Sequence, residues 1–193
     1  MILVGIDPSY TRTGLVILDT ELKEITSIRV ENKIGEKDYV NLYNKANEQS
    51  YNINRLISQK PDFIMSECPF SQAQFSSGLF ALDSLMFYKL SQRCPKAIDV
   101  LHPSYLKYLH KNAKYTKTDS VNLAKEFLKV YQVHGYSFDV QGRWSNDECE
   151  AFLFLTRLFV KLGIDSVLIR ELAQVNTRIM DIKETRLFSL EEE

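Results

Sequence analysis

The sequence predicts an α/β fold, with a mixed five-stranded sheet flanked by helices and a helical C-terminal extension. Two observations support this class. Three apolar, β-branched runs near the N-terminus are joined by short connections, which is typical of an antiparallel meander. Helical stretches with a period of three to four residues then alternate with two more short apolar runs. Such alternation requires a mixed sheet with helices on its faces.

Each expected element follows from its own pattern. We expect strands at residues 1–6, 14–19, 24–30, 63–65 and 98–101. Helices are expected from residue 40 to the stop at Lys60-Pro61, then over 79–90, 105–111, 120–131 and 145–162, with a helical pattern continuing over 164–186. Residues 135–142 are expected to form a loop. Because no repeat or linker interrupts the chain, we expect one domain over 1–163, with 164–193 as its helical extension.

Composition excludes several classes of protein. The 193 residues are 45% hydrophobic and 25% charged, which excludes disordered and collagen-like chains. No apolar run approaches the ~18 residues of a membrane span, so we expect no membrane association. The chain has three cysteines, an odd number without CxxC spacing, which favours a reducing cytoplasm over a disulfide framework or a zinc site. They are Cys68, Cys94 and Cys149.

The net charge of −1 conceals a segregated charge distribution. No acid lies between Asp99 and Asp119, and tyrosines are interleaved with the lysines of this interval. The lysines are Lys107, Lys111, Lys114 and Lys117. A solvated face is the ordinary interpretation of such a stretch. Because the interval follows a sheet whose other strands end in acids, contact with nucleic-acid phosphates is favoured here.

Two acids follow predicted buried strands. Asp7 comes after the first strand and Glu67 after the strand at 63–65. Burying a strand up to a carboxylate is costly unless the charge meets a cation or a hydrogen-bond donor, so neighbouring strand ends are natural places for metal ligands. Alternatively, Asp7 caps a turn and Glu67 is simply exposed, and the two interpretations are about equally weighted for either acid.

A second pair of acids opens the helix predicted from residue 145. Asp147 and Glu150 are spaced i, i+3 and share a face with core-directed apolar residues, while Ser145 and Glu148 fit a capping box. Acids in a first helical turn are most often solvated, which is the alternative. Four carboxylates without a His pair or CxxC favour Mg²⁺ or Mn²⁺ over zinc. Such ions support phosphodiester hydrolysis.

Together these motifs resemble the RuvC-type Holliday-junction resolvases of the ribonuclease H-like superfamily. The likeness extends over most of the chain and rests on ordered motifs. They are Gly5-Ile6-Asp7-Pro8-Ser9, Thr13-Gly14, Glu67-Cys68-Pro69-Phe70, Lys117 at a helix start, and Asp147-Glu148-Cys149-Glu150-Ala151. The resemblance implies a ribonuclease H-like nuclease domain and a homodimer that binds four-way DNA junctions. It also implies paired nicking that uses two divalent ions. Mg²⁺ is the expected ion, and Mn²⁺ is expected to be able to replace it.

The resemblance also assigns roles by position. It makes Asp7, Glu67, Asp147 and Glu150 metal ligands, and it places Lys107 and Lys117 near the scissile phosphate and the DNA backbone. Phe70 matches an aromatic residue inserted at the junction centre. Glu150 stands where many cellular members have Asp, and Ser9-Tyr10 replaces a usual Gly-Ser pair. These departures indicate a divergent, phage-type member, acting in a bacterial or phage-infected host cytoplasm.

Two alternatives stay open at the level of sequence. One is a nuclease of the same fold that acts on flaps or RNA–DNA hybrids, and the other is a non-catalytic DNA-binding member. For the expected homodimer, the helix over 79–90 is the candidate interface, because three aromatics lie off its main apolar stripe. They are Phe80, Phe87 and Tyr88.

Overall fold

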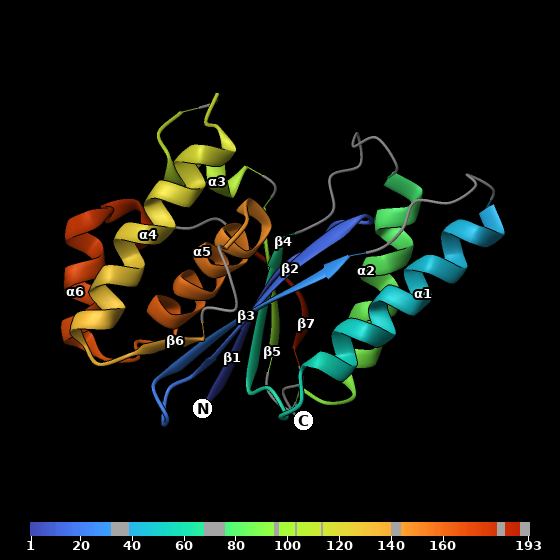
Figure 1. The fold of residues 1–193 in the computed structure, drawn as a ribbon, viewed down its shortest axis with the longest axis horizontal. Coiled ribbons are helices and arrows are strands. Elements are labelled where there is room, and N and C mark those ends of the chain that lie inside the picture. The colour runs from blue at the N-terminus through green and yellow to red at the C-terminus, as the bar shows by residue number, and fades with distance from the viewer. Residues whose placement is uncertain are drawn as a thin grey trace.

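The computed structural model describes residues 1–31, 39–67, 76–94, 97–102, 104–112, 114–139, 144–180 and 184–189. Within these ranges a seven-stranded sheet has the order β6-β3-β2-β1-β4-β5-β7 (Figure 1). The strands are β1 Ile2–Asp7, β2 Arg12–Asp19, β3 Glu24–Glu31, β4 Phe63–Glu67, β5 Ala97–Leu101, β6 Ser137–Asp139 and β7 Glu184–Ser189. β1, β2 and β3 form the expected antiparallel meander, and β4 and β5 run parallel to β1.

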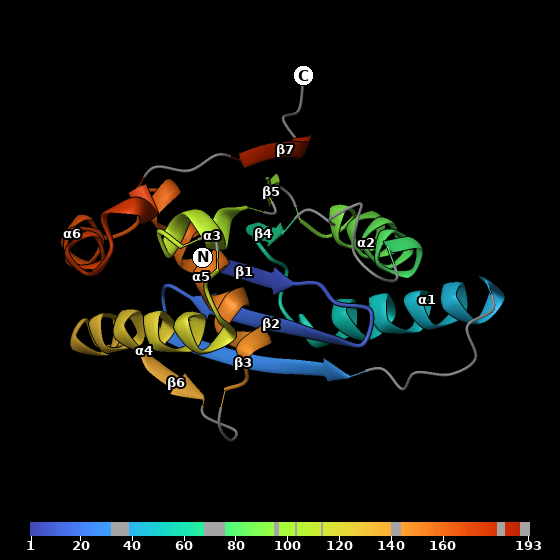
Figure 2. The same cartoon turned by 90° about the horizontal axis from the view of Figure 1, so that it is seen from above.

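Helices cover both faces of the sheet (Figures 1 and 2). The helices are α1 Tyr39–Leu56, α2 Ser76–Ser91, α3 Tyr105–Leu109, α4 Lys117–Val133, α5 Asn146–Lys161, α6 Ser166–Val175 and the 3₁₀ helix η1 Thr177–Met180. α1 and α2 pack together on one face, while α5 packs directly on β1, β2 and β4 from the other. α4 lies against α5, so α5 is enclosed between the sheet and the outer helices.

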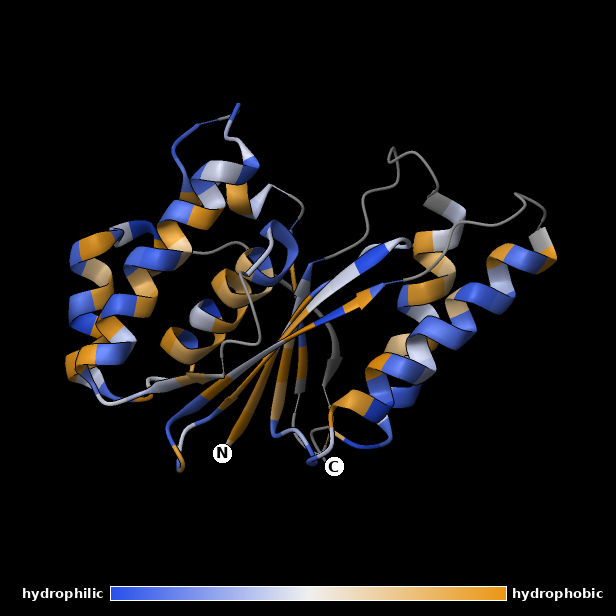
Figure 3. Cartoon of the chain, viewed as in Figure 1, coloured by the Kyte–Doolittle hydropathy of each residue, from blue (hydrophilic) through white to orange (hydrophobic). Residues whose placement is uncertain are grey.

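Alternation along the strands separates two apolar cores. In β1, Leu3 belongs to the core under α5, and its neighbour Val4 belongs to the core under α1 and α2. Figure 3 shows the apolar central strands and the amphipathic helices that cover them. Strands buried on both faces are typical of sheets with helices on each side. None of the described helices is long and apolar enough to span a membrane.

Two glycines allow α5 to lie unusually close to the sheet. A Cβ atom on Gly5 would lie 2.1 Å from the carbonyl oxygen of Ala151, and one on Gly14 would lie 2.1 Å from that of Asp147. Both neighbours are backbone atoms of α5, which cannot rotate away as a side chain could. The start of α5 is therefore held directly over β1 and β2.

The structure adds two edge strands to the five predicted ones. The helical prediction over 164–186 holds for α6 and η1 but is wrong over 184–186, where β7 pairs antiparallel with β5. The loop prediction over 135–142 is wrong for β6, which pairs parallel with β3. Both strands satisfy an otherwise open sheet edge, and local periodicity cannot reveal which segment an edge will recruit. The domain boundary at residue 163 stays a prediction.

The close packing of α5 can be tested at Gly14. Gly14→Ala is expected to lower the free energy of unfolding by about 1–3 kcal/mol, the usual cost of overpacking, because the new methyl group meets the Asp147 backbone. Gly135→Ala is the control: its Cβ would meet only Lys23 side-chain atoms, at 4.0 Å, and its positive φ should cost ~1 kcal/mol. Urea denaturation compares them. A Gly14→Ala protein at least as stable as wild type would contradict the close packing.

Candidate functional site

Asp7 and Glu67 end two neighbouring parallel strands. β1 and β4 pair in register up to Ile6 opposite Ser66, so the residues that follow, Asp7 and Glu67, lie at the same edge of the sheet. The alternation along both strands directs these two side chains to the face that α5 covers. Asp7 is buried and Glu67 is half-buried. The structure thus brings the two strand-end acids together on one face.

The first two turns of α5 supply Asp147 and Glu150. Both are buried, with 5% and 8% of their surface exposed, as their shared inward face predicts. The Glu148 carboxylate accepts a hydrogen bond from the backbone N–H of Ser145 at 3.0 Å, completing the predicted capping box. Glu148 therefore holds the start of the helix, and the two acids beside it face the strand ends.

Three of the four acids, Asp7, Glu67 and Glu150, have raised pKa values. Burial raises the pKa of Asp7 well above its ordinary value, and the charges of the other three acids raise it further. Burial also raises the pKa of Glu67 to about 8, with Glu150 adding to the effect. The pKa of Glu150 is raised by burial and lowered by a hydrogen bond from the Ser120 hydroxyl, 3.1 Å away. All four predicted carboxylates therefore share one site, while their catalytic and metal-binding roles stay predictions.

Two cations lie against Asp147. Lys117 Nζ is 3.6 Å from Asp147 Oδ1, and the guanidinium of Arg12 forms an ion pair with Oδ2. Lys117 is the first residue of α4, and Thr116 caps that helix by accepting a hydrogen bond from the Asp119 backbone N–H at 3.3 Å. The structure thus places Lys117 at the acids. Sequence reasoning missed Arg12, because a single arginine at a strand start forms no pattern.

The donor chemistry of this cluster fits Mg²⁺ or Mn²⁺. All four side chains offer carboxylate oxygens, which hard divalent cations prefer, and a divalent cation relieves the repulsion among neighbouring carboxylates. In the part of the chain that the structure describes, no three His, Cys, Asp or Glu side chains are already arranged to hold an ion.

The remaining predicted DNA-binding residues lie at the same end of the sheet or outside the described chain. Lys107 on α3 is exposed, as are Lys111 and Lys114 between α3 and α4. Figure 1 shows this α3–α4 connection at the end of the sheet where β1 and β4 finish. Phe70 lies outside the described residues. The DNA-binding roles of all four stay predictions.

A set of side chains that sequence reasoning did not assign to the site supports Glu150. Ser120 is fully buried, donates its hydrogen bond to Glu150, and lies 3.3 Å from His110 Nε2. The His110 ring stacks on Tyr115 with centroids 5.0 Å apart. Burial and then the charges of three site acids raise the pKa of Tyr115, which therefore lies near them. The sequence signal that could have pointed to Tyr115 was the interleaving of tyrosines with lysines between Asp99 and Asp119.

Asp83 on α2 is another buried acid near the site, and the sequence contained no signal for it. It is 3% exposed, and both of its carboxylate oxygens lack a hydrogen-bond partner among the described residues. Burial raises its pKa to about 8, and its charge contributes to the raised pKa of Glu67. Asp83 therefore lies within electrostatic reach of the acid cluster, although its helix covers the opposite face of the sheet.

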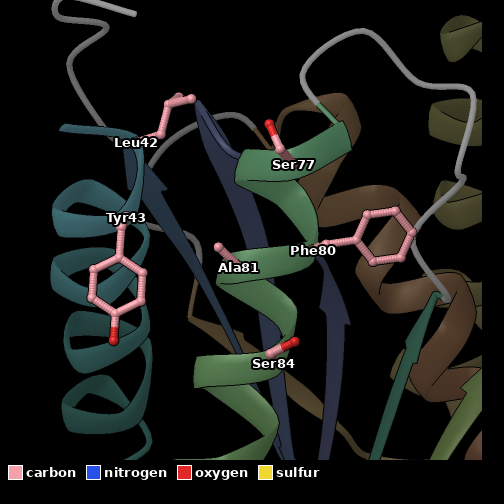
Figure 4. A pocket seen from close by; sticks show the side chains of 6 residues that line it. All are labelled: Leu42, Tyr43, Ser77, Phe80, Ala81 and Ser84. Carbon is pink, nitrogen blue, oxygen red and sulfur yellow. The ribbon is translucent and has the colours of Figure 1, made fainter. Parts of the chain in front are cut away.

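The groove between α1 and α2 differs in character from the acid cluster. It is lined by Leu42, Tyr43, Ser77, Phe80, Ala81 and Ser84 (Figure 4). None of these side chains carries a charge, and both helices lie on the side of the sheet away from α5. The groove therefore lacks the charged groups that characterise the acid cluster.

Asp83 makes stability depend on pH in a testable way. Its folded pKa of about 8 lies above the ordinary value of 3.8, so the folded protein keeps a proton that the unfolded chain releases between these values. The contribution of Asp83 to stability therefore falls as pH rises through this window. Asp83→Asn should stabilise the protein more at about pH 8.5 than at about pH 5.5 in urea denaturation. The exposed Glu126→Gln is the control, and an equal gain at both pH values would contradict the assignment.

Comparison with known proteins identifies the fold. No protein-family model and no curated protein sequence matches the chain. The structure of T. thermophilus RuvC in complex with Holliday junction substrate matches with a TM-score of 0.55 and 14% identity, over 84% of this chain and 96% of that one. Another Thermus thermophilus RuvC structure matches with a TM-score of 0.51 and 14% identity, over 84% and 97%. The predicted class is therefore confirmed: the chain has the ribonuclease H-like α/β fold of RuvC.

Proposed function

We propose that this chain is a metal-dependent endonuclease that resolves four-way Holliday junctions by paired nicks in branched DNA. The observation that carries the proposal is the convergence of four carboxylates at the start of α5, with two cations against one of them. The fold likeness supports it, since one RuvC neighbour is in complex with Holliday junction substrate.

The four carboxylates are proposed to hold Mg²⁺, with Mn²⁺ able to replace it. Two such ions, when bound, activate a water and stabilise the leaving oxygen of a phosphodiester. The chain supplies oxygen ligands from two strand ends and one helix, elements that packing holds in place. Lys117 is 61% exposed, so its ammonium group can pair with a DNA phosphate beside the acids.

Affinity and branch selectivity are proposed to come from different residues. The exposed Lys107, Lys111 and Lys114 would contact DNA phosphates, which supplies affinity for any duplex. Phe70 follows Glu67 by three residues, and we propose that it stacks on bases unpaired at the crossover. Such stacking is worth about 1–3 kcal/mol per base. An intact duplex does not allow it, because its bases are already paired and stacked on one another.

The proposed compartment is the cytoplasm of a bacterium or of a phage-infected host. Cys94 and Cys149 are buried and are not joined in a disulfide, a state that a reducing compartment preserves. The proposed substrate, branched DNA formed during recombination or repair, is met in the same compartment.

One gel assay tests the substrate class. It compares four-way, three-way, flap, RNA–DNA hybrid and linear duplex substrates with Mg²⁺ and with Mn²⁺. Preferential paired nicking of the four-way junction supports the proposal. Preferential cutting of flaps or hybrids would identify a different nuclease on the same fold. DNA binding without any cutting would identify a non-catalytic member.

The carboxylates should act as one unit. Each of four amide variants is expected to reduce junction cleavage by at least about a hundredfold, because each removes a proposed ion ligand. They are Asp7→Asn, Glu67→Gln, Asp147→Asn and Glu150→Gln. Thermal stability should hold or rise in the Asp7, Glu67 and Glu150 variants, since repulsion is relieved, whereas the Asp147 variant also loses its two ion pairs. Glu126→Gln, exposed on α4, is the control. Near-normal cleavage by any two of the four variants would remove the ion-site assignment.

We also propose a homodimer, because symmetric nicking of a four-way junction is most simply done by a two-fold assembly. α2 is the candidate interface, with Phe80 and Tyr88 exposed by 42% and 65%. Phe87 was expected beside them, and that expectation is wrong: it is 4% exposed and packs in the core under α2. The exposed face of α2 is therefore narrower than its sequence indicates.

Sedimentation tests the assembly. The chain should sediment as a dimer, and Phe80→Glu combined with Tyr88→Glu should shift it toward the monomer, because burying new charges at an interface is costly. Tyr51→Glu, at an exposed site on α1, is the control and should stay dimeric. A monomer both in free solution and on junction DNA would contradict the proposal.

A further inference from the structure

Arg12 begins β2 and reaches the start of α5. It precedes Gly14 by two residues and so lies on the same face of the strand, the face on which the Asp147 backbone approaches Gly14. The Arg12 side chain is 39% exposed, whereas that of Asp147 is 7% exposed. A partly solvated guanidinium therefore stands at the edge of the acid cluster.

The adjacent strand provides a matched arginine with a different partner. Arg29 on β3 pairs opposite Gly14 and donates hydrogen bonds to Glu148, with Nε–Oε1 at 3.2 Å and Nη2–Oε2 at 3.4 Å. Glu148 is also held by the backbone N–H of Ser145. The Arg29 pair therefore belongs to the cap of α5. Its two hydrogen bonds join the Arg29 guanidinium to both carboxylate oxygens of Glu148.

The Arg12 pair differs from the Arg29 pair because it ends on a site acid and not on the helix cap. Asp147 Oδ2 contacts the Arg12 guanidinium but has no hydrogen-bond partner among the described residues, so the contact is ionic without an aligned hydrogen bond. Asp147 is also shared with Lys117. If the Asp147 carboxylate rotates to bind a divalent ion, Arg12 loses its ion-pair partner. A free guanidinium binds a phosphate through its planar fork of donors.

We propose that Arg12 is a phosphate-binding residue that Asp147 holds in the ion-free protein and releases to the DNA backbone when Asp147 binds an ion. The inference rests on the proposed function and adds an exchange of partners at one arginine. Because both ligands act on the same ion pair, ion binding and DNA binding favour each other.

The exchange can be measured without ions. Binding of a labelled four-way junction is followed in EDTA at several KCl concentrations, where no strand is cut. Asp147→Asn removes the anion that holds Arg12, and so frees Arg12 without an ion. The salt slope is the change in the logarithm of the binding constant with the logarithm of the KCl concentration. In the wild-type background, we expect Arg12→Gln to leave this slope unchanged. In the Asp147→Asn protein it should lower the slope by about one and weaken binding roughly 3- to 10-fold.

Arg29→Gln is the matched control, since it removes the same charge one strand away. It should leave the salt slope unchanged in both backgrounds. Calorimetric titration of Mn²⁺ without DNA adds a second readout. Arg12→Gln should bind Mn²⁺ at least about twofold more tightly, because a competing cation is gone, and Arg29→Gln should bind it as the wild type does.

Two results would overturn the exchange. An equal loss of slope in both backgrounds would make Arg12 a fixed phosphate contact, and an unchanged slope in both would make it a structural ion pair. If Arg12→Gln does not fold, the salt slope is measured instead for Arg12→Lys in the Asp147→Asn background. Because lysine keeps the positive charge, the slope should be preserved. Failure of the proposed function would be seen separately. If the wild-type chain cuts no branched DNA, the nuclease proposal is wrong, whatever the salt slopes show.

Discussion

The close approach of α5 to the sheet at Gly5 and Gly14 brings Asp147 and Glu150 to the acids at the strand ends. Without side chains at these two positions, the helix backbone descends onto β1 and β2. Asp147 and Glu150 then share a face with the acids that end β1 and β4. The cluster therefore follows from backbone packing.

Convergence of like charges has an energetic cost that the fold offsets only in part. Burial and mutual repulsion raise the pKa of Asp7, Glu67 and Glu150. Lys117 and the hydroxyl of Ser120 act in the opposite direction on Glu150. The remaining imbalance is of the kind that a bound divalent cation removes. Strain of this sort is typical of functional sites, because a core selected only for stability would avoid it.

The acid cluster and the groove between α1 and α2 lie on opposite faces of the sheet. The α5 face carries the acids, and two arginines on adjacent strands meet the first turn of that helix in different ways. Arg29 completes a cap, whereas Arg12 stays partly solvated beside Asp147. The α1–α2 face is aromatic and uncharged along its groove (Figure 4). The proposed ion site and the proposed dimer interface therefore lie on opposite faces of the sheet.

Local patterns by themselves determined the five central strands, the main helices, the α5 capping box and the four acids. These features depend on periodicity, turn residues and spacing within a few positions, all of which the sequence displays directly. Only the tertiary structure decided that β6 and β7 would extend the sheet, that Phe87 and Asp83 would be buried, and that Arg12 would meet Asp147. Each of these depends on which distant segment meets an open edge or a helix face, and that choice is made by packing across the whole chain.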